Sequence, residues 1–236
     1  LNINMEKPSI DTAKAGAMRF NTDSSQMEIY DGNQWTGILS TSGELQTGST
    51  RGFFAGGNST NIDFITVDTT GNAQDFGDLT TTFWINKCSA SRVRGLIHGD
   101  RPDTTNIDFI TIAQKGNAQD FGDMTAARED PAGVSNGTRA VLCGGEDEAP
   151  GNIIDYVTIA QTGNAVDFGD LSANSNTPLA ANSSTRGLIG GVGETNVIDF
   201  ITIATTGNAA DFGDLTVARS GGAVGPLGNS TRGIFV

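Results

Sequence analysis

The sequence predicts an all-β fold: a β-propeller of five blades with four antiparallel strands each, the last blade being shared by the N- and C-termini. Three observations predict it. The composition is rich in turn-forming residues, with 32 glycines among 236 residues and only 17% charged residues. A sequence repeat recurs with a period in the forties, and the incomplete repeats at the two chain ends complement each other.

The repeat contains about four short predicted strands. Five segments share a Thr-Arg-Gly type start, at 50–57, 92–100, 138–145, 185–191 and 231–236. The first four are followed by segments rich in β-branched and aromatic residues, at 61–67, 106–112, 153–159 and 197–203. A glycine-asparagine turn, an Asp-Phe-Gly-Asp stretch and a run of small residues complete each repeat. Because one small sheet cannot bury both faces alone, such units are expected to stack as propeller blades.

Two resemblances follow from these residues. "TRGFFAGG" (50–57) and "ARSGGAVGPLGNSTRGIFV" (218–236) resemble the first two strands of a kelch repeat, and "NIDFITVDTTGNAQDFGDLT" (61–80) resembles its third and fourth. The sequence departs from the kelch pattern at His98-Gly99, which interrupts the glycine doublet, and at the usual tryptophan, which is replaced by Phe76, Phe121, Phe168 and Phe212. From about residue 50 onward the chain is also similar to repeats of marine tailed-phage virion proteins of the cyanophage type, including tail-fibre proteins.

The N-terminal region is distinct in sequence from the repeats that follow it. Residues 1–15 are expected to be an arm or linker, and residues 40–236 to form the kelch-like propeller repeats. Residues 16–39 alternate apolar and polar residues around "TDSSQ" and "YDGNQW" turns, which predicts a β-meander. We expect this meander to supply strands three and four of the blade that the C-terminal segment begins. The alternative is a separate attachment element, as a resemblance to phage tail fibres implies.

The Asp-Phe-Gly strings are predicted to be structural. In protein kinases this string binds magnesium only beside a glycine-rich loop, a strand lysine and a catalytic loop, which this sequence lacks. The string instead resembles the Asp-box turn of propeller proteins, in which aspartate accepts backbone N–H bonds and glycine takes a positive φ. The four predicted turns contain Asp75 and Gly77, Asp120 and Gly122, Asp167 and Gly169, and Asp211 and Gly213.

Two further sets of residues recur once per repeat. Arginines stand at the strand starts (Arg51, Arg94, Arg139, Arg186 and Arg232), and aspartates stand in the next strand (Asp63, Asp108, Asp155 and Asp199). One hypothesis is an ion pair between strands or blades. The other is that both sets are solvated strand ends.

Charge and motifs exclude several classes of function. A formal net charge of -13 disfavours nucleic-acid binding, and no apolar run is long enough for membrane insertion. The sequence contains one histidine, no nucleophile-elbow or zincin motif and no calcium-loop ligand series. We therefore expect no catalytic residues, no metal and no cofactor, and classify the protein as a non-enzyme.

Length variation points to a recognition surface. From the strand arginine to the isoleucine of the next block the spacing is 11, 13, 15 and 12 residues, whereas from there to the next arginine it is 32, 32, 32 and 34. Loops that vary on a fixed scaffold often carry recognition, although neutral drift gives the same pattern. These connections are expected to ring one end of the propeller, with candidate ligand contacts Asp100, Arg101, Asp103, Glu146, Asp147, Glu148 and Glu194.

The phage resemblance implies a virion location and a role on a fibre, baseplate or capsid appendage, in host attachment or in binding other virion proteins. The expected partners are virion proteins and a host-surface glycan or protein. A homo-oligomer is expected, with a trimer as one arrangement. Two alternatives remain: a virion propeller enzyme that degrades polysaccharide, and a purely architectural virion component.

Overall fold

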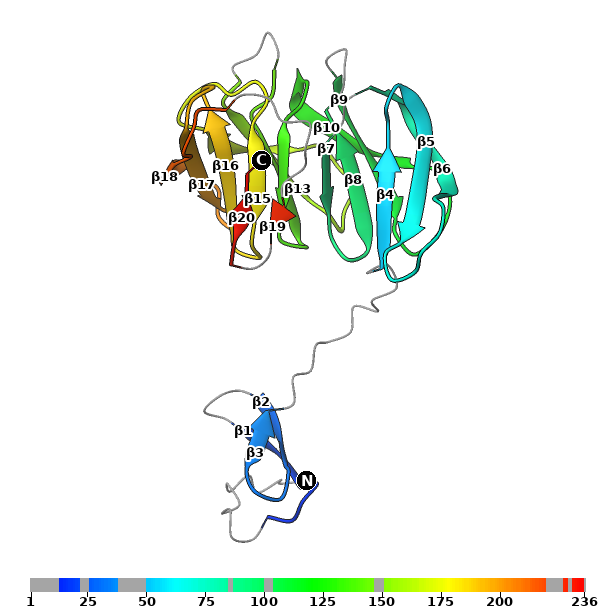
Figure 1. Cartoon of the computed structure of the whole chain (residues 1–236), viewed down its shortest axis with the longest axis vertical. Coiled ribbons are helices and arrows are strands. Elements are labelled where there is room, and N and C mark those ends of the chain that lie inside the picture. The colour runs from blue at the N-terminus through cyan, green and yellow to red at the C-terminus, as the bar shows by residue number, and fades with distance from the viewer. Residues whose placement is uncertain are drawn as a thin grey trace. The chain divides into compact units, whose positions relative to one another are not determined.

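The structure is a computed structural model, and it describes residues 13–21, 26–37, 50–84, 87–99, 104–146, 151–219, 227–228 and 231–235. All elements in these ranges are β-strands (Figure 1). The chain divides into two compact units, Leu1–Leu45 and Gln46–Val236. The predicted all-β class is thereby confirmed.

The first unit contains one antiparallel sheet in the order β1-β2-β3. Its strands are β1 (Met18–Asn21), β2 (Gln26–Tyr30) and β3 (Trp35–Gly37). The β2–β3 hairpin closes because Asp31 accepts the backbone N–H groups of Asn33 at 2.7 Å and Gln34 at 2.8 Å. These two bonds favour the charged form and lower the pKa of Asp31. The predicted β-meander over 16–39 therefore exists.

Strands β19 (Leu227–Gly228) and β20 (Gly233–Ile234) form a two-stranded sheet, and in the described residues β1, β2 and β3 pair with one another. The blade shared by the two chain ends stays a prediction. Pairing within the meander follows from its local connections, because hairpins with short connections lose little loop entropy. An Arg19–Glu28 ion pair at 2.7 Å and a Tyr30–Trp35 ring contact at 5.4 Å join these strands.

The second unit contains four larger antiparallel sheets, one per complete repeat. The first, in the order β4-β5-β6, has three strands: β4 (Arg51–Ala55), β5 (Ser59–Thr66) and β6 (Gln74–Phe83). The second contains β7 (Lys87–Ala90), β8 (Arg94–His98), β9 (Thr104–Thr111) and β10 (Gln119–Arg128). The third contains β11 (Ala132–Ser135), β12 (Arg139–Cys143), β13 (Ile153–Thr158) and β14 (Val166–Asp170). The fourth contains β15 (Leu179–Asn182), β16 (Arg186–Val192), β17 (Val197–Thr202) and β18 (Ala210–Asp214).

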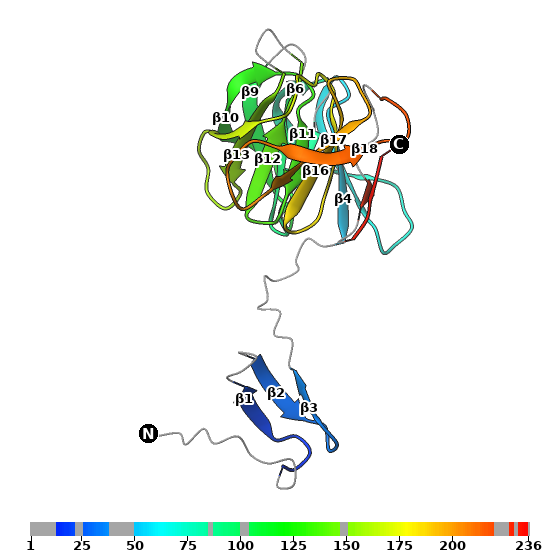
Figure 2. The same cartoon turned by 90° about the vertical axis from the view of Figure 1, so that its left-hand side faces the viewer.

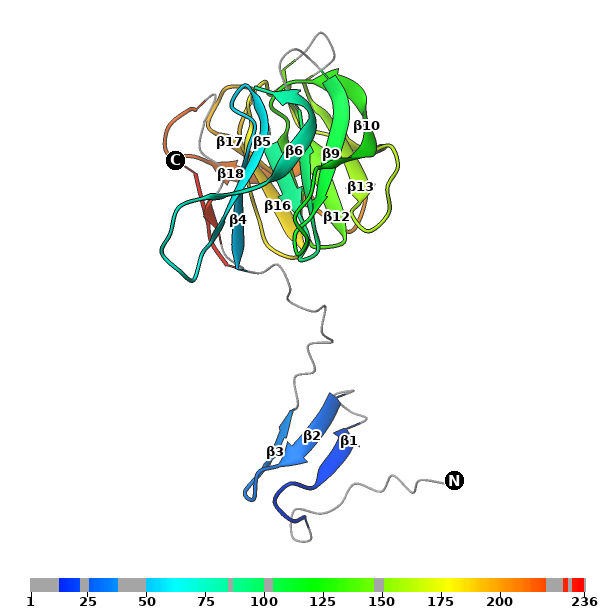
Figure 3. The ribbon, with the colours of Figure 1, turned by 90° about the vertical axis from the view of Figure 1, so that its right-hand side faces the viewer.

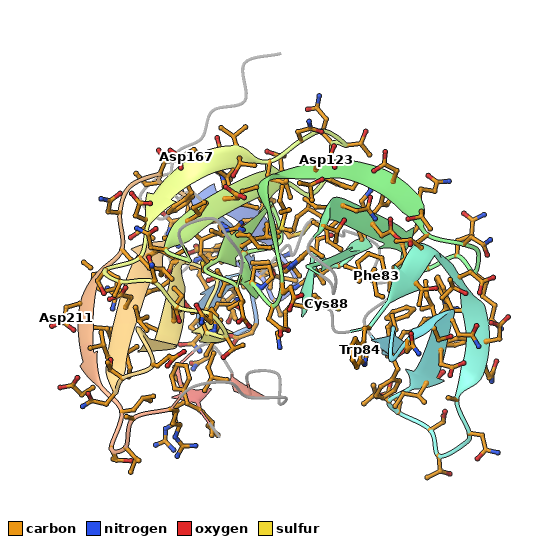
Figure 4. All side chains as sticks on the ribbon, turned by 90° about the horizontal axis from the view of Figure 1, so that it is seen from above. Phe83, Trp84, Cys88, Asp123, Asp167 and Asp211 are labelled. Carbon is orange, nitrogen blue, oxygen red and sulfur yellow. The ribbon has the colours of Figure 1, made fainter. Side chains whose placement is uncertain are left out.

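These sheets follow one another around an arc in a propeller-like arrangement (Figures 2, 3 and 4). The first strands β7, β11 and β15 of successive sheets contact each other on the inside of the arc. In the part of the chain that the structure describes, the sheets do not form a closed ring (Figure 4). The number of blades in a complete ring therefore stays a prediction.

The core lies between sheets. One cluster joins Phe121 and Met124 of the second sheet to Val157, Ile159 and Ala165 of the third, all at most 9% exposed. Equivalent clusters join the first sheet to the second and the third to the fourth. Because each sheet buries its apolar face only against a neighbour, the repeats stabilise one another in pairs, as expected for stacked units.

Candidate functional site

The predicted recognition residues lie in the connections that follow β8, β12 and β16. Because β4, β8, β12 and β16 are equivalent strands, their C-terminal connections lie at one end of the unit, toward which β4 and β16 run in Figure 1. Five of the predicted contacts fall outside the described residues: Asp100, Arg101, Asp103, Asp147 and Glu148. The structure describes the other two, Glu146 and Glu194.

Glu146 and Glu194 have exposed side chains held on ordered backbone. Glu146 forms a bridge with Glu129, and their backbone N–H and carbonyl groups exchange bonds of 2.8 and 2.9 Å. Glu194 has a φ of 61°, a conformation that non-glycine residues seldom adopt, and its Oε1 accepts a 3.5 Å bond from Asn176. Of the seven candidate contacts, the described residues thus include two exposed carboxylates, Glu146 and Glu194.

The Asp-Phe-Gly strings lie inside strands, and the prediction that they form hairpin turns is wrong. In each of the four larger sheets the last two strands shift register at this string, as between Asp120 and Gly122, which marks a β-bulge at the phenylalanine. The predicted positive φ is confirmed, at 150° for Gly77, 140° for Gly122, 147° for Gly169 and 139° for Gly213. The predicted aspartate bonds are recorded in two copies, from Gly122 to Asp120 at 3.0 Å and from Gly213 to Asp211 at 2.9 Å. For Asp75 and Asp167 the described structure records no such bond.

The bulge forms part of a hydrogen-bonded junction between successive repeats. Gly163 of the third repeat donates its backbone N–H to the carbonyl of Phe121 in the second, and Ala165 donates to the carbonyl of Asp123, both at 2.7 Å. Asn164 Oδ1 accepts the Asp123 N–H at 3.2 Å. A Cβ on Gly122 would lie 2.6 Å from the carbonyl group of Gly163, so the close approach requires glycine. The same three bonds recur between the first and second repeats and between the third and fourth.

The recurring aspartates also join repeats. Asp108 of the second repeat accepts the N–H of Thr80 at 2.8 Å and its hydroxyl at 2.6 Å, across the junction with the first. Asp155 binds Thr125, and Asp199 binds Ser172, in the same way. These three aspartates are 0% exposed. Asp63, the equivalent residue of the first complete repeat, is exposed.

The recurring arginines do not pair with these aspartates, so the predicted repeat ion pair is wrong. Arg94 donates to the carbonyl of Ile159 in the following repeat at 3.0 Å, and its guanidinium lies 4.6 Å from the ring centre of Phe109 in its own sheet. Arg51 and Arg139 do the same with the carbonyls of Ile112 and Ala204. A planar guanidinium can stack its face on an aromatic ring while its N–H groups donate hydrogen bonds in the plane. These contacts satisfy the arginine without an ion pair.

This junction was not predicted from the sequence. The signal that could have found it is the Gly-Asn-Ala triplet, which is identical in all four repeats at 71–73, 116–118, 163–165 and 207–209. A turn that only contacts solvent would not need the same three residues in every repeat. A turn that binds the preceding repeat does need them.

One buried polar group differs from the repeat pattern. His98 is 0% exposed, and its Nε2 lies 3.2 Å from Ser89 Oγ. Burial, together with the positive charges of Arg128 and Lys87, lowers the pKa of His98 to about 3. His98 therefore stays neutral at physiological pH and is packed away from solvent, consistent with a substitution within a strand.

The described residues contain no group of three or more His, Cys, Asp or Glu side chains that could hold a metal ion. They also contain no helix long and apolar enough to cross a bilayer.

Comparison with known proteins informs the fold alone. No family model matches the chain, and no curated protein matches it. A structure described as "Structure of YjhT" aligns over 71% of this chain and 64% of that chain, with a TM-score of 0.58 and 4% identity. A Kuenenia stuttgartiensis hydrazine synthase structure aligns over 74% and 51%, with a TM-score of 0.51 and 12% identity. This chain thus spans less than two thirds of either, and such low identities support the propeller-like all-β arrangement only.

Proposed function

We propose that this protein is a non-enzymatic virion component: a propeller-like module on a phage fibre, baseplate or capsid appendage that binds a host surface or another virion protein. The observation that carries the proposal is the contrast between constant and variable parts. Junction residues repeat almost without change, whereas the connections after β4, β8, β12 and β16 vary in length at one end. The virion part of the proposal rests on the resemblance of the repeats to tailed-phage proteins.

The chemistry of the variable end suits adhesion. The connections contain "GGEDEAPGN" (144–152) and "GGVGETN" (190–196), and the two described glutamates, Glu146 and Glu194, are exposed there. Carboxylates on ordered backbone can accept hydrogen bonds from sugar hydroxyls or pair with basic protein groups. The junctions hold these connections at fixed spacing, which favours multivalent contact with a repetitive surface.

A loop exchange tests the proposal. Residues 144–152 are replaced by the shorter 190–196 segment, and particles carrying the variant are compared with wild type for assembly and host adsorption. We expect normal assembly and lost adsorption. The matched control replaces the hairpin 136–138, at the opposite end of the third sheet, by residues 183–185, and this exchange should leave adsorption unchanged.

Other outcomes favour the other two functions. Failed assembly of the loop variant would support a purely architectural role. Release of reducing ends from host polysaccharide by the purified protein, abolished by one carboxylate substitution, would refute the non-enzymatic assignment.

A further inference from the structure

Each junction between repeats has two halves. The preceding half consists of the second-strand arginine, the bulged Phe-Gly-Asp and the Thr or Ser two residues after that aspartate. The following half consists of the aspartate of the next repeat, a carbonyl one or two residues beyond the strand that contains this aspartate, and the Gly-Asn-Ala turn. The three internal junctions use the same bonds between these halves.

The fourth repeat carries a complete preceding half, which we name the open face: Arg186, Phe212, Gly213, Asp214 and Thr216. In the described ranges no fifth repeat contributes a following half. Phe212 is accordingly 48% exposed, whereas Phe76, Phe121 and Phe168 are each 2% exposed. A Cβ on Gly213 would have nothing within 4 Å, while one on Gly169 would lie 2.5 Å from the carbonyl group of Gly207.

The inner strands of a fifth sheet already stand beside the open face. Strands β19 and β20 contact β15, just as β11 and β12 contact β7. Gly233 of β20 packs closely against β15, because a Cβ added to Gly233 would lie 2.7 Å from the Ala181 side chain. A cavity of about 290 Å³ remains beside the open face, and its lining includes Arg186, Phe212, Arg232 and Gly233. In the described ranges of Gln46–Val236, no strands occupy the two outer positions of this fifth sheet.

We propose that the open face binds a β-hairpin of a partner protein with the pattern of this chain's own third and fourth strands: a strand with Ile-Asp-Phe-Ile-Thr character followed by a Gly-Asn-Ala turn. The hairpin's aspartate accepts the N–H and hydroxyl of Thr216. Its Gly and Ala N–H groups donate to the carbonyls of Phe212 and Asp214, and its asparagine accepts the Asp214 N–H. Arg186 donates to the carbonyl at the end of its first strand.

An isolated hairpin suits the site better than a whole sheet. The four hairpins of this type in the chain are paired within their own sheets, as β5–β6, β9–β10, β13–β14 and β17–β18. The first sheet of a second copy would bring β4 with it, and β4 would occupy the position that β20 already takes. A partner that presents only the outer two strands adds to the edge of β20 without this clash, as in β-augmentation.

The experiment uses a fluorescein-labelled peptide of residues 104–124, "TTNIDFITIAQKGNAQDFGDM", and the full chain, with binding followed by fluorescence anisotropy. We expect saturable binding at one site. An Asp108→Ala peptide and a Thr216→Val protein should each bind about tenfold more weakly, because each loses a hydrogen bond to a charged acceptor. The control Thr205→Val changes an exposed threonine in the turn between β17 and β18, away from the open face, and should leave the affinity unchanged.

Two results would overturn the proposal: absence of binding at millimolar peptide, or binding that neither Asp108→Ala nor Thr216→Val weakens. The Asn117→Ala peptide keeps the test independent of protein folding, since only the peptide changes. It should lose the bond that mirrors the 3.2 Å contact between Asp78 N–H and Asn117 Oδ1 and therefore bind more weakly.

Discussion

Arg128 and Asp155 form an ion pair with an Nη2–Oδ2 distance of 2.6 Å, and their side chains are only 1% and 0% exposed. Arg128 ends the fourth strand of the second repeat, and Asp155 lies in the third strand of the third. Arg128 also donates to the carbonyl of Ile153 at 2.8 Å. This junction thus contains a buried charge pair in addition to the bonds that the other junctions share.

Breaking this pair should be costly. Asp155→Asn leaves the Arg128 guanidinium buried without its counter-charge, which we expect to lower the free energy of unfolding by about 3–5 kcal/mol. Urea denaturation measures the change. Asp167→Asn alters an exposed aspartate and should change stability by less than about 0.5 kcal/mol. Equal effects of the two substitutions would contradict a stabilising role for the pair.

The threonines of the Phe-Gly-Asp-x-Thr pattern allow a comparison within one chain. Thr80→Val removes the 2.6 Å hydroxyl bond to Asp108, and we expect a loss of about 1.5 kcal/mol of stability. Thr216→Val changes the equivalent residue of the fourth repeat, which has no following aspartate in the described structure, and should be nearly neutral. Thermal unfolding of both variants checks this. A similar loss of stability in Thr216→Val would mean that the effect of Thr80→Val comes from local strand propensity and not from the junction.

The bulge glycines permit a second comparison. Gly122→Ala and Gly213→Ala impose the same strain, because φ is 140° and 139° at the two positions. Only Gly122→Ala also forces a methyl group against the Gly163 backbone. We expect Gly122→Ala to destabilise the protein by at least about 1 kcal/mol more than Gly213→Ala, from overpacking at the junction. Denaturant midpoints of the two variants measure the difference, and coinciding midpoints would refute it.

Lowering the pH should lower the free energy of unfolding, and His98 should cause part of this loss. Its pKa in the folded chain is lowered to about 3, below its ordinary value of 6.5, so the unfolded chain binds a proton more readily. This contribution to stability is complete above pH 6.5 and declines as the pH falls from 6.5 toward 3.

His98→Gln, which keeps a hydrogen-bonding group beside Ser89, should flatten the decline between pH 6.5 and 4.5 in urea unfolding series. His98 is the only histidine in the sequence, so the difference between the two pH profiles can be assigned to it. Parallel profiles would show that the carboxylates alone cause the decline.

The sequence predicted the strands well and their long-range partners poorly. The segment 106–112 was predicted as a strand from its β-branched and aromatic residues, and β9 covers Thr104–Thr111. The residues that this strand contacts across the junction could not be predicted in this way. A residue that recurs in every repeat does not indicate which neighbouring repeat it contacts. Arg94 and Asp108 were therefore considered as a pair, although the structure directs them to opposite neighbours, Ile159 and Thr80.

The hairpin turn predicted at the Asp-Phe-Gly strings was wrong for a related physical reason. A positive φ at Gly122 fits both a hairpin turn and a β-bulge, and only the register shift against Ile107 distinguishes them. For residues 16–39, alternation predicted a meander but contained no information on which sheet the meander joins. In the candidate site, length variation located the connections, and the exposed carboxylates Glu146 and Glu194 agree with solvent-facing loops.

The Gly-Asn-Ala turn and the Phe-Gly-Asp bulge stand on the same repeat, a few residues apart in sequence. A tandem duplication of the coding segment would therefore copy both halves of the junction together, and the new unit would carry the groups that form the shared bonds with its neighbours. Arrays of this kind can change their number of units in a single genetic event. The close similarity of "GNAQDFGDLT" (71–80) and "GNAQDFGDMT" (116–125) is what recent copying of this sort would leave behind.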